Sequence, residues 1–233
     1  MKKKVILTLL SVLLFASPAI AGPTTPSGIT AEDIISRVRV DINSPSAKDS
    51  FFADAEFIQW TNEAVRQIIN QTRCLESGTS EIVLEENTRR YAISGTFLDI
   101  EVVEYDSGDT TSPTQIYTLD RVEKRDIGHN KEKGTPKVYC VWANSLEVWP
   151  IPRSSEAGTT LYLYKIDQPS GVTTSTSPIE TPSYLDAAVL FYVKAKALNK
   201  DRPPDLGNPS LAIFDAMVKE YIINVLRRKP IGQ

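Results

Sequence analysis

Residues 50–75 constrain the fold most strongly, because they carry the clearest helical pattern in the chain. Asp54 suits the N-cap position, where its carboxylate can accept hydrogen bonds from the first turn. The apolar residues after it recur at the spacing of an amphipathic helix. Their predicted face comprises Phe57, Ile58, Ala64, Val65, Ile68 and Ile69, with Trp60 at its edge. The pattern predicts a long helix with one buried side.

A shorter amphipathic segment precedes this helix and extends the predicted N-terminal helical region to residues 30–75. Thr30 and Asp33 have the spacing of a capping box, in which side chains satisfy backbone N–H groups at a helix start. The apolar residues after this box fall on one side: Ile34, Ile35, Val38 and Ile42.

Two further helices are predicted over residues 183–228, because apolar residues again recur with a period of 3.6. The first face comprises Leu185, Ala188, Val189, Tyr192 and Ala195, and the second comprises Leu211, Phe214, Val218, Tyr221, Ile222 and Val225. Pro203 and Pro204 lie between the two faces and cannot continue a helix.

Residues 80–167 have the β-branched and aromatic composition of strands. Pro150 and Pro152 end a predicted hairpin, since proline offers no N–H to a sheet. The last strand is apolar on both faces, which predicts a central position. The predicted strands cover residues 81–84, 91–93, 98–105, 138–142, 146–149 and 161–166, and residues 122–127 are expected to form a short helix or turn.

Residues 168–182 are rich in Ser, Thr and Pro and contain few large apolar side chains, which predicts an exposed and mobile loop. Helices at both ends with strands between them predict an α+β fold. We expect a helical body built from the N- and C-terminal helices, with an inserted and mainly antiparallel β segment.

The first 21 residues have the layout of a secretory signal peptide. Lys2, Lys3 and Lys4 precede an apolar run from Val5 to Phe15, and Ala19-Ile20-Ala21 is a small-x-small cleavage pattern. The run is shorter than the roughly 20 residues that span a membrane, and no later segment approaches that length. We therefore expect a leader over residues 1–21, a single domain over residues 22–233, and no stable membrane insertion.

Charge and residue usage argue against several classes of function. The net charge of −3 is unlike that of dedicated nucleic-acid binders, which neutralise phosphates with basic residues. The single histidine, His129, supports neither a catalytic triad nor a metal site, so we expect no catalytic residues, cofactor or metal. Cys74 and Cys140 are read as two buried thiols; if the chain is exported, one bridge between them becomes an option.

Six short motifs occur in an order that resembles one known family. After the two N-terminal helices come Pro136-Lys137-Val138-Tyr139, a strand that ends in Trp149-Pro150-Ile151-Pro152, and Thr160-Leu161-Tyr162-Leu163-Tyr164. The two C-terminal helices begin near Pro182 and Asn208. Over residues 29–228 this order resembles the head-to-tail adaptor (connector) proteins of tailed bacteriophages, although a leader is not typical of that family.

The resemblance implies a structural subunit of a cyclic ring at the head–tail interface of the virion. Its partners would be further copies of itself, the portal protein and a tail protein, and DNA would pass through without sequence-specific binding. The candidate partner-contact residues are Trp60, Arg66, Arg73, Gly171, Val172, Thr173, Thr174, Ser175, Arg227 and Arg228.

An alternative reading starts from the leader and the aromatic residues of the β segment. An exported, periplasmic or secreted, non-catalytic binding module would use an aromatic platform for a sugar or peptide. Its residues would be Trp142, Trp149, Tyr162 and Tyr164. The competing reading places these four side chains in the sheet core, because they alternate with aliphatic residues. A repurposed prophage gene would reconcile the leader with the family resemblance.

Overall fold

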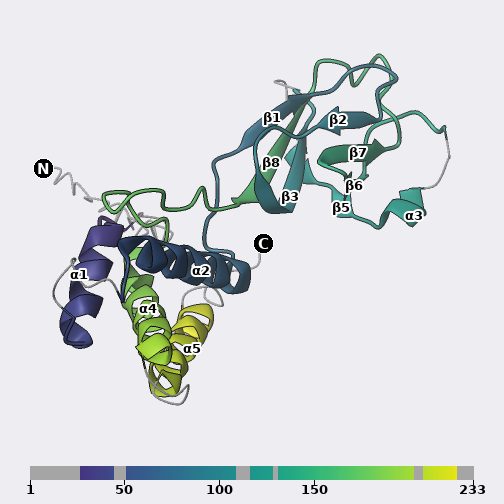
Figure 1. Ribbon diagram of the computed structural model, residues 1–233. Coiled ribbons are helices and arrows are strands. Elements are labelled where there is room, and N and C mark those ends of the chain that lie inside the picture. Colours follow the sequence, from purple (N-terminus) through teal and green to yellow (C-terminus); the bar gives the residue numbers. More distant parts are fainter. Residues whose placement is uncertain (1–26, 45–50, 109–115, 128–130, 202–206, 225–233) are drawn as a thin grey trace, which may run out of the picture.

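The computed structural model describes residues 27–44, 51–108, 116–127, 131–201 and 207–224. These residues form a helical body and a β body joined by a narrow neck (Figure 1). The α+β class is confirmed, with helices from both ends of the chain and the strands between them. The leader, the Pro203-Pro204 connection and His129 lie outside the described residues.

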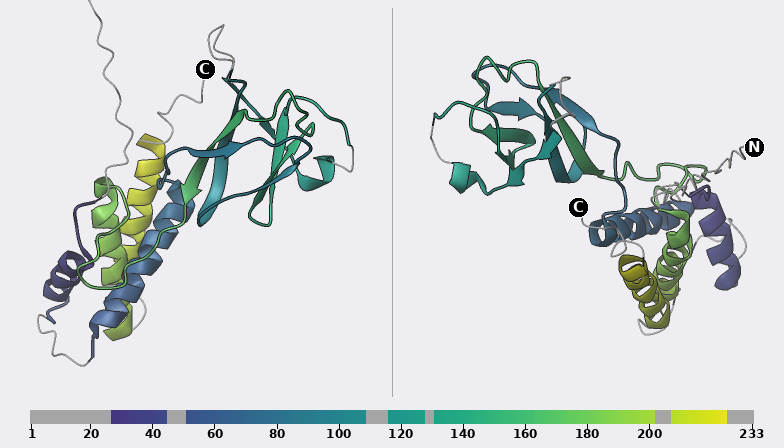
Figure 2. Two further views of the ribbon diagram at one scale, coloured as in Figure 1. Left: turned by 90° about the horizontal axis from the view of Figure 1, so that it is seen from above. Right: turned by 180° about the vertical axis from the view of Figure 1, so that it is seen from behind.

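The helical body brings together segments from both ends of the sequence. In Figure 2, α2 and α4 lie side by side, with α1 on one side of the body and α5 on the other. Its elements are α1 Ala31–Asp41, α2 Asp54–Thr72, the 3-10 turn η1 Ser183–Leu185, α4 Asp186–Asp201 and α5 Asn208–Asn224.

The helix starts follow capping chemistry, with one correction. Thr30 caps α1 as expected, since its hydroxyl accepts from the Asp33 N–H and the Asp33 carboxylate accepts from the Thr30 N–H at 2.9 Å. Asp54, expected at the N-cap of α2, is instead its first residue, and Ala53 occupies the cap. The carboxylate of Asp54 bonds Arg39 of α1 at 2.7 Å. This carboxylate therefore joins the two helices. At the start of α2, the Ala53 N–H donates a hydrogen bond to the Glu56 carboxylate.

One hydrophobic core lies between the helices and confirms the predicted faces. Phe57, Ile68, Val189, Phe214 and Tyr221 are each almost fully buried. Trp60 packs at the edge of this core, with its ring 5.4 Å from that of Phe57. Ile42, Ile58, Leu211 and Ile222 are half-buried against it, and Val225 lies outside the described residues.

Three lysines of α4 add ion pairs with α1 and α2 to this packing. Lys194 bonds Asp41 of α1 at 2.7 Å, and Lys196 bonds Glu63 of α2 at 2.8 Å. Lys200 reaches Glu56, near the start of α2, at 2.6 Å. Both N-terminal helices are thereby tied to the same C-terminal helix.

The β body is a sandwich of two four-stranded sheets with its own core. The sheet orders are β1-β8-β3-β4 and β2-β7-β6-β5, and only β5 and β6 pair in parallel. Leu146, Val148, Leu161 and Leu163 fill the space between the sheets. The strands are β1 Ser80–Val83, β2 Arg90–Ala92, β3 Phe97–Asp106, β4 Ile116–Thr118, β5 Asp120–Arg121, β6 Val138–Trp142, β7 Ser145–Trp149 and β8 Thr160–Asp167.

The strand predictions hold for most of this body. The β6–β7 hairpin forms, with Ala143 and Asn144 at positive φ in its turn, and β8 is central in its sheet. The short helix α3, Lys124–Ile127, lies where a helix or turn was expected. Strands β4 and β5 were not anticipated, because each is too short to show a clear alternation. The single-domain expectation stays a prediction, although the hydrophobic core is divided in two.

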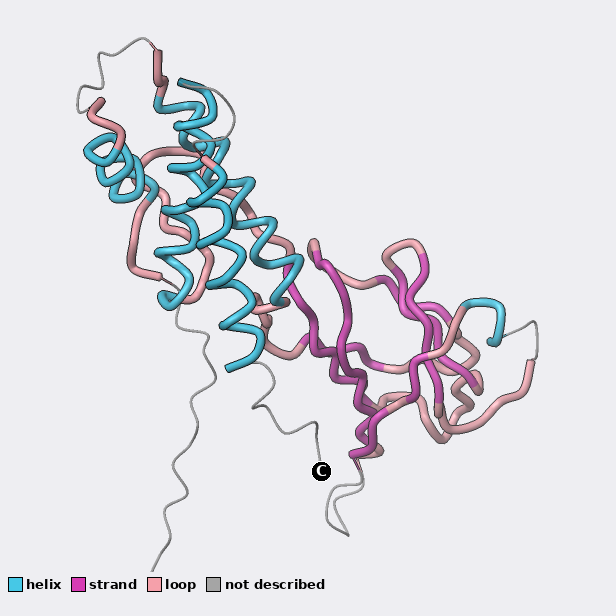
Figure 3. Tube along the Cα trace, turned by 90° about the horizontal axis from the view of Figure 1, so that it is seen from below, coloured by secondary structure: helices cyan, strands magenta, loops and turns pink. Residues whose placement is uncertain are grey.

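The neck consists of residues 73–79 and 164–168, where the chain leaves the helical body and returns to it (Figure 3). The two segments run antiparallel, with Ser77 N–H donating to the Lys165 carbonyl and Asp167 N–H to the Leu75 carbonyl, both at 2.9 Å. Glu76 and Ile166 form a β-bridge between these bonds. The β body is thus an insertion whose two ends are hydrogen-bonded to each other.

The buried face of α2 generates a stability prediction. Ile68→Ala should lower the free energy of unfolding by about 2–5 kcal/mol, because Ile68 is fully buried and its truncation leaves a cavity. Ile213→Ala, at a 41% exposed position of α5, should cost less than about 0.5 kcal/mol. Urea titration of the full chain measures both, and equal costs would mean that the core is misassigned.

The α4 ion pairs generate a pH prediction. The hydrogen bond from Lys196 lowers the pKa of Glu63 from its usual 4.5. A lowered carboxylate pKa stabilises the fold above the unfolded pKa, and this stability is lost as pH falls through the folded value. Lys196→Gln should therefore be less stable than the parent at pH 7, and the difference should shrink as the pH falls below 4.5, the unfolded pKa of Glu63. A difference that persists unchanged at the lower pH would show that the loss is one of packing.

Candidate partner-contact surface

Residues 168–182, the strap, form a loop that is exposed in part, as expected at Thr173 and Thr174, but that is also hydrogen-bonded along the helical body, which was not expected. Backbone hydrogen bonds join them to the segment that leads into α1: Ser27 N–H donates to the Thr181 carbonyl, and Ile179 N–H to the Ile29 carbonyl. Val172 and Ile179 are buried. Ordering a loop costs chain entropy, and the composition suggested that little would offset this cost. The backbone hydrogen bonds and the two buried apolar side chains offset it.

Asn62 of α2 holds the first half of this strap. Its side-chain oxygen accepts from the Val172 N–H at 2.6 Å, and its amide nitrogen donates to the Val172 carbonyl at 2.9 Å. Gly171 has a φ of +84°, and a Cβ there would lie 3.3 Å from the Asn62 side-chain oxygen. A small residue at positive φ is needed for the strap to approach the helix this closely.

The strap and α2 border a groove of about 280 Å³, and we call this region the strap surface. It brings together the candidates Arg66, Gly171, Val172 and Thr173 with Asn62. Arg66 and Thr173 are exposed beside it, as is Thr174, whereas Ser175 is half-buried at a second groove next to α1. Asn62 was missed by sequence reasoning; its signal is an Asn in the middle of a helix, where such residues are disfavoured without a partner.

The other candidates lie apart from the strap surface. Trp60 is half-buried against Phe57 and belongs to the edge of the core. Arg73 is in the neck, where its guanidinium contacts Asp99 of β3 at 3.1 Å and Glu101 at 3.8 Å. Arg121 of β5 bonds the same Asp99 at 2.9 Å. Arg227 and Arg228 lie outside the described residues.

Both cysteines are free and buried in the structure. Cys74 belongs to the helical core and Cys140 to strand β6 of the β body, so the optional bridge is not formed. Burial raises the pKa of both thiols, which keeps them neutral and poorly nucleophilic. The reading as two buried thiols fits their positions.

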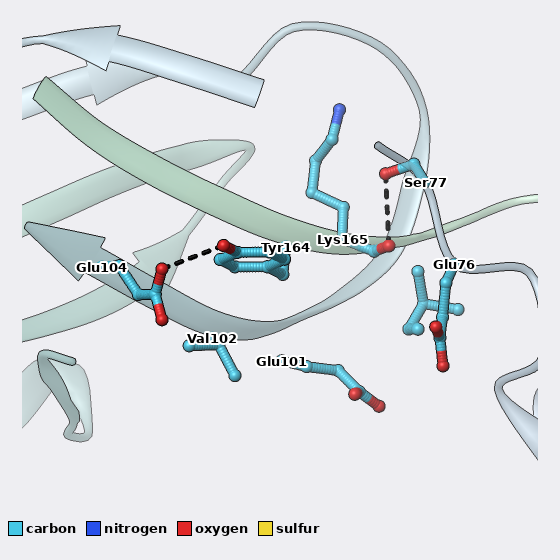
Figure 4. A pocket seen from close by; sticks show the side chains of 8 residues that line it. Glu76, Ser77, Glu101, Val102, Glu104, Tyr164 and Lys165 are labelled. Atoms are coloured by element: carbon cyan, nitrogen blue, oxygen red, sulfur yellow. Dashed lines mark hydrogen bonds between the residues drawn. The ribbon is translucent and has the colours of Figure 1, made fainter. Parts of the chain in front are cut away.

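A third groove, the neck groove, lies where β3 and β8 meet the neck (Figure 4). It is lined by Glu76, Ser77, Glu101, Val102, Glu104, Tyr164, Lys165 and Ile166. The Tyr164 hydroxyl donates to Glu104 at 2.9 Å, and this bond is the main reason that the pKa of Tyr164 is raised. The amine of Lys165 points away from the carboxylates and donates to the Ser94 carbonyl.

The four aromatic residues of the alternative reading do not form one platform. Tyr162 and Tyr164 alternate with the buried Leu161 and Leu163, so they lie on the outer face of their sheet. Trp142 and Trp149 belong to the other sheet of the sandwich. Trp142 and Tyr164 are exposed and the other two half-buried, so the core assignment of these side chains is wrong as well.

Two kinds of feature are absent from the described residues. Within them, no group of three or more His, Cys, Asp or Glu side chains is placed to hold a metal ion. Across the same ranges, no helix has both the length and the apolar character that crossing a membrane requires. The arrangement instead presents two bodies with polar grooves and exposed loops, which suits contact with other proteins.

Comparison with known protein families gives a match over most of the chain. The family model described as SU10 adaptor protein matches residues 29–231. The match begins just before α1 and covers both bodies, the neck and the strap. No curated protein matches the chain.

The strap surface generates a prediction about Asn62. Asn62→Ala should lower the free energy of unfolding by about 1–3 kcal/mol and speed hydrogen exchange of the Val172 amide, because both Val172 backbone groups lose a partner. Asn70→Ala, at an exposed position of the same helix, is the matched control and should change neither. Slow exchange of the Val172 amide in the Asn62 variant would show that the two Asn62–Val172 hydrogen bonds do not hold the strap.

Proposed function

The chain belongs to the SU10 adaptor protein family, a family of phage head-tail adaptors, and we propose that it is a structural, non-catalytic subunit of the connector ring between portal and tail. The observation that carries this proposal is the family match across both bodies, residues 29–231. In the proposed assembly the subunit lies at the head–tail interface of the virion.

The arrangement of the helical body supports a cyclic assembly. Helices α1 and α5 lie on opposite sides of α4, so a subunit can present different faces to its two neighbours (Figure 1). Contacts between different faces close into a ring when the rotation between subunits is suitable. Each copy would then meet two others through its helices.

The strap surface is the part that we propose for contact with the portal or tail protein. Arg66, Thr173 and Thr174 are exposed on it and can donate hydrogen bonds without rearrangement of the core. Since the strap is already ordered by Asn62, contact there would cost little further chain entropy. Deletion of residues 171–177 would remove buried backbone bonds, so the point variants Arg66→Ala and Thr174→Ala are the better probes.

The DNA path is proposed on the basis of charge and family. A net charge of −3 provides little phosphate-neutralising capacity. Walls of this kind let DNA pass without sequence-specific binding. No role for a cofactor or metal is part of the proposal.

The proposal predicts assembly that depends on a template. Alone, the chain should be mainly monomeric at micromolar concentration, because each contact is small until a ring satisfies both faces. With the cognate portal protein it should sediment as a portal-bound complex containing several copies. Arg66→Ala with Thr174→Ala should weaken that complex and leave the melting temperature unchanged.

Analytical ultracentrifugation measures both states. Arg90→Ala, at an exposed position of the β body, is the control for loss of one surface arginine. A stable closed ring without portal would contradict the template step, and failure of the unaltered chain to bind portal would contradict the proposed function.

A further inference from the structure

The neck groove carries more negative than positive charge among the described residues that line it. Glu101 and Glu104 stand on β3 and Glu76 on the neck, around the side chain of Tyr164 (Figure 4). The one lysine of the lining, Lys165, is 8% exposed and is turned toward the Ser94 carbonyl. Arg73 of the neck already lies 3.8 Å from Glu101, and with three carboxylates in its lining the groove favours a further cationic occupant.

The groove also has apolar and aromatic walls, so it is more than a set of surface carboxylates. Val102 and Tyr164 are cross-strand partners on the outer face of the sheet, and no described element covers them. Tyr164 is 38% exposed, so part of its aromatic ring is open to solvent. An Arg side chain can stack on such a ring while its guanidinium bonds a carboxylate.

The position of the end of α5 indicates a candidate for this occupant. Its last turn lies beside the end of α2, where the neck begins (Figure 2). Tyr221 in that turn is 1% exposed, and its hydroxyl has no hydrogen-bond partner. Burial, then the proximity of Cys74 and Glu76, raises the pKa of Tyr221 to about 12. A buried, unpartnered hydroxyl therefore lies close to Glu76 at the edge of the groove.

The sequence beyond α5 supplies the matching charge. The helix is described to Asn224, and Arg227-Arg228-Lys229 follow within a few residues. Three residues of extended chain span about 10 Å. Because Tyr221 in the last turn of α5 interacts with Glu76 of the groove lining, the segment begins on the side of the neck where the groove lies.

We propose that the neck groove is the docking site for the basic segment 227–229 of the same chain. Arg227 or Arg228 bonds Glu101 or Glu104 and covers the ring of Tyr164. The contact gives the two bodies a second connection beside the backbone bonds of the neck. It does not depend on the proposed function.

Zero-length cross-linking of the full chain tests this contact. A water-soluble carbodiimide joins a lysine to a carboxylate only when the two are in contact, and Lys229 is the reporter. In the purified monomer, mass spectrometry should find Lys229 joined to Glu101, Glu104 or Glu76. The pair Lys200–Glu56, 2.6 Å apart within the helical body, should also be joined and reports that the protein is folded.

Two double variants separate docking from general attraction. Arg227→Glu with Arg228→Glu should lower the yield of the Lys229 link by about tenfold while leaving the Lys200–Glu56 link unchanged. Lys131→Glu with Lys133→Glu changes the net charge equally at exposed positions of the β body and should leave both links unchanged.

A mixture of isotope-labelled and unlabelled chains identifies which chain supplies the segment. Links within one chain carry a single label state, as the proposal requires. Links of mixed label would show that a second copy fills the groove and would overturn the proposal. Absence of a Lys229 link to any groove carboxylate, with Lys200–Glu56 intact, would overturn it as well.

Discussion

The structure depends on the short antiparallel pairing in the neck. Two backbone bonds, from Ser77 to Lys165 and from Asp167 to Leu75, join the ends of an insertion that contains all the strands of the described residues. Because those ends are held together, the β body can fold around its own core without separating α2 from α4. Arg73 reinforces the junction through Asp99, which is also bonded by Arg121 of β5. The neck thus combines backbone pairing with a charge network.

Much of the fold was predictable because local patterns and tertiary packing agree. The faces of α2 and α4 follow the period of 3.6, and the β6–β7 hairpin follows from its two short strands and its turn. The hydrogen bonding of the strap was missed because composition does not reveal backbone pairing between distant segments. Val172 and Ile179 are the only large aliphatic residues in it, and both are buried. The N-cap of α2 was displaced by one residue because Asp54 is engaged by Arg39, a contact between helices.

The candidate site was predictable only in part, for a related reason. Arg66 and the strap residues were selected as separate features, and Asn62 is the residue that brings them together. Arg73 was selected for its charge, and its partner Asp99 could not be identified without the pairing of β3 with β8. The four aromatic residues were expected to form either one platform or part of the sheet core. Tyr162 and Tyr164 instead face outward from one sheet, and the two tryptophans belong to the other sheet. Which sheet a strand joins is decided by long-range pairing.

The chain belongs to a family of phage head-tail adaptors, and in the proposed function its two bodies serve assembly. Electron cryomicroscopy of phage particles assembled in cells that express this chain tests this most directly. The account predicts a ring of copies between portal and tail, in which the helical and β bodies fit the density as the structure has them. Particles that assemble and contain no copy of the chain, with a processed form found outside the cytoplasm, would contradict it.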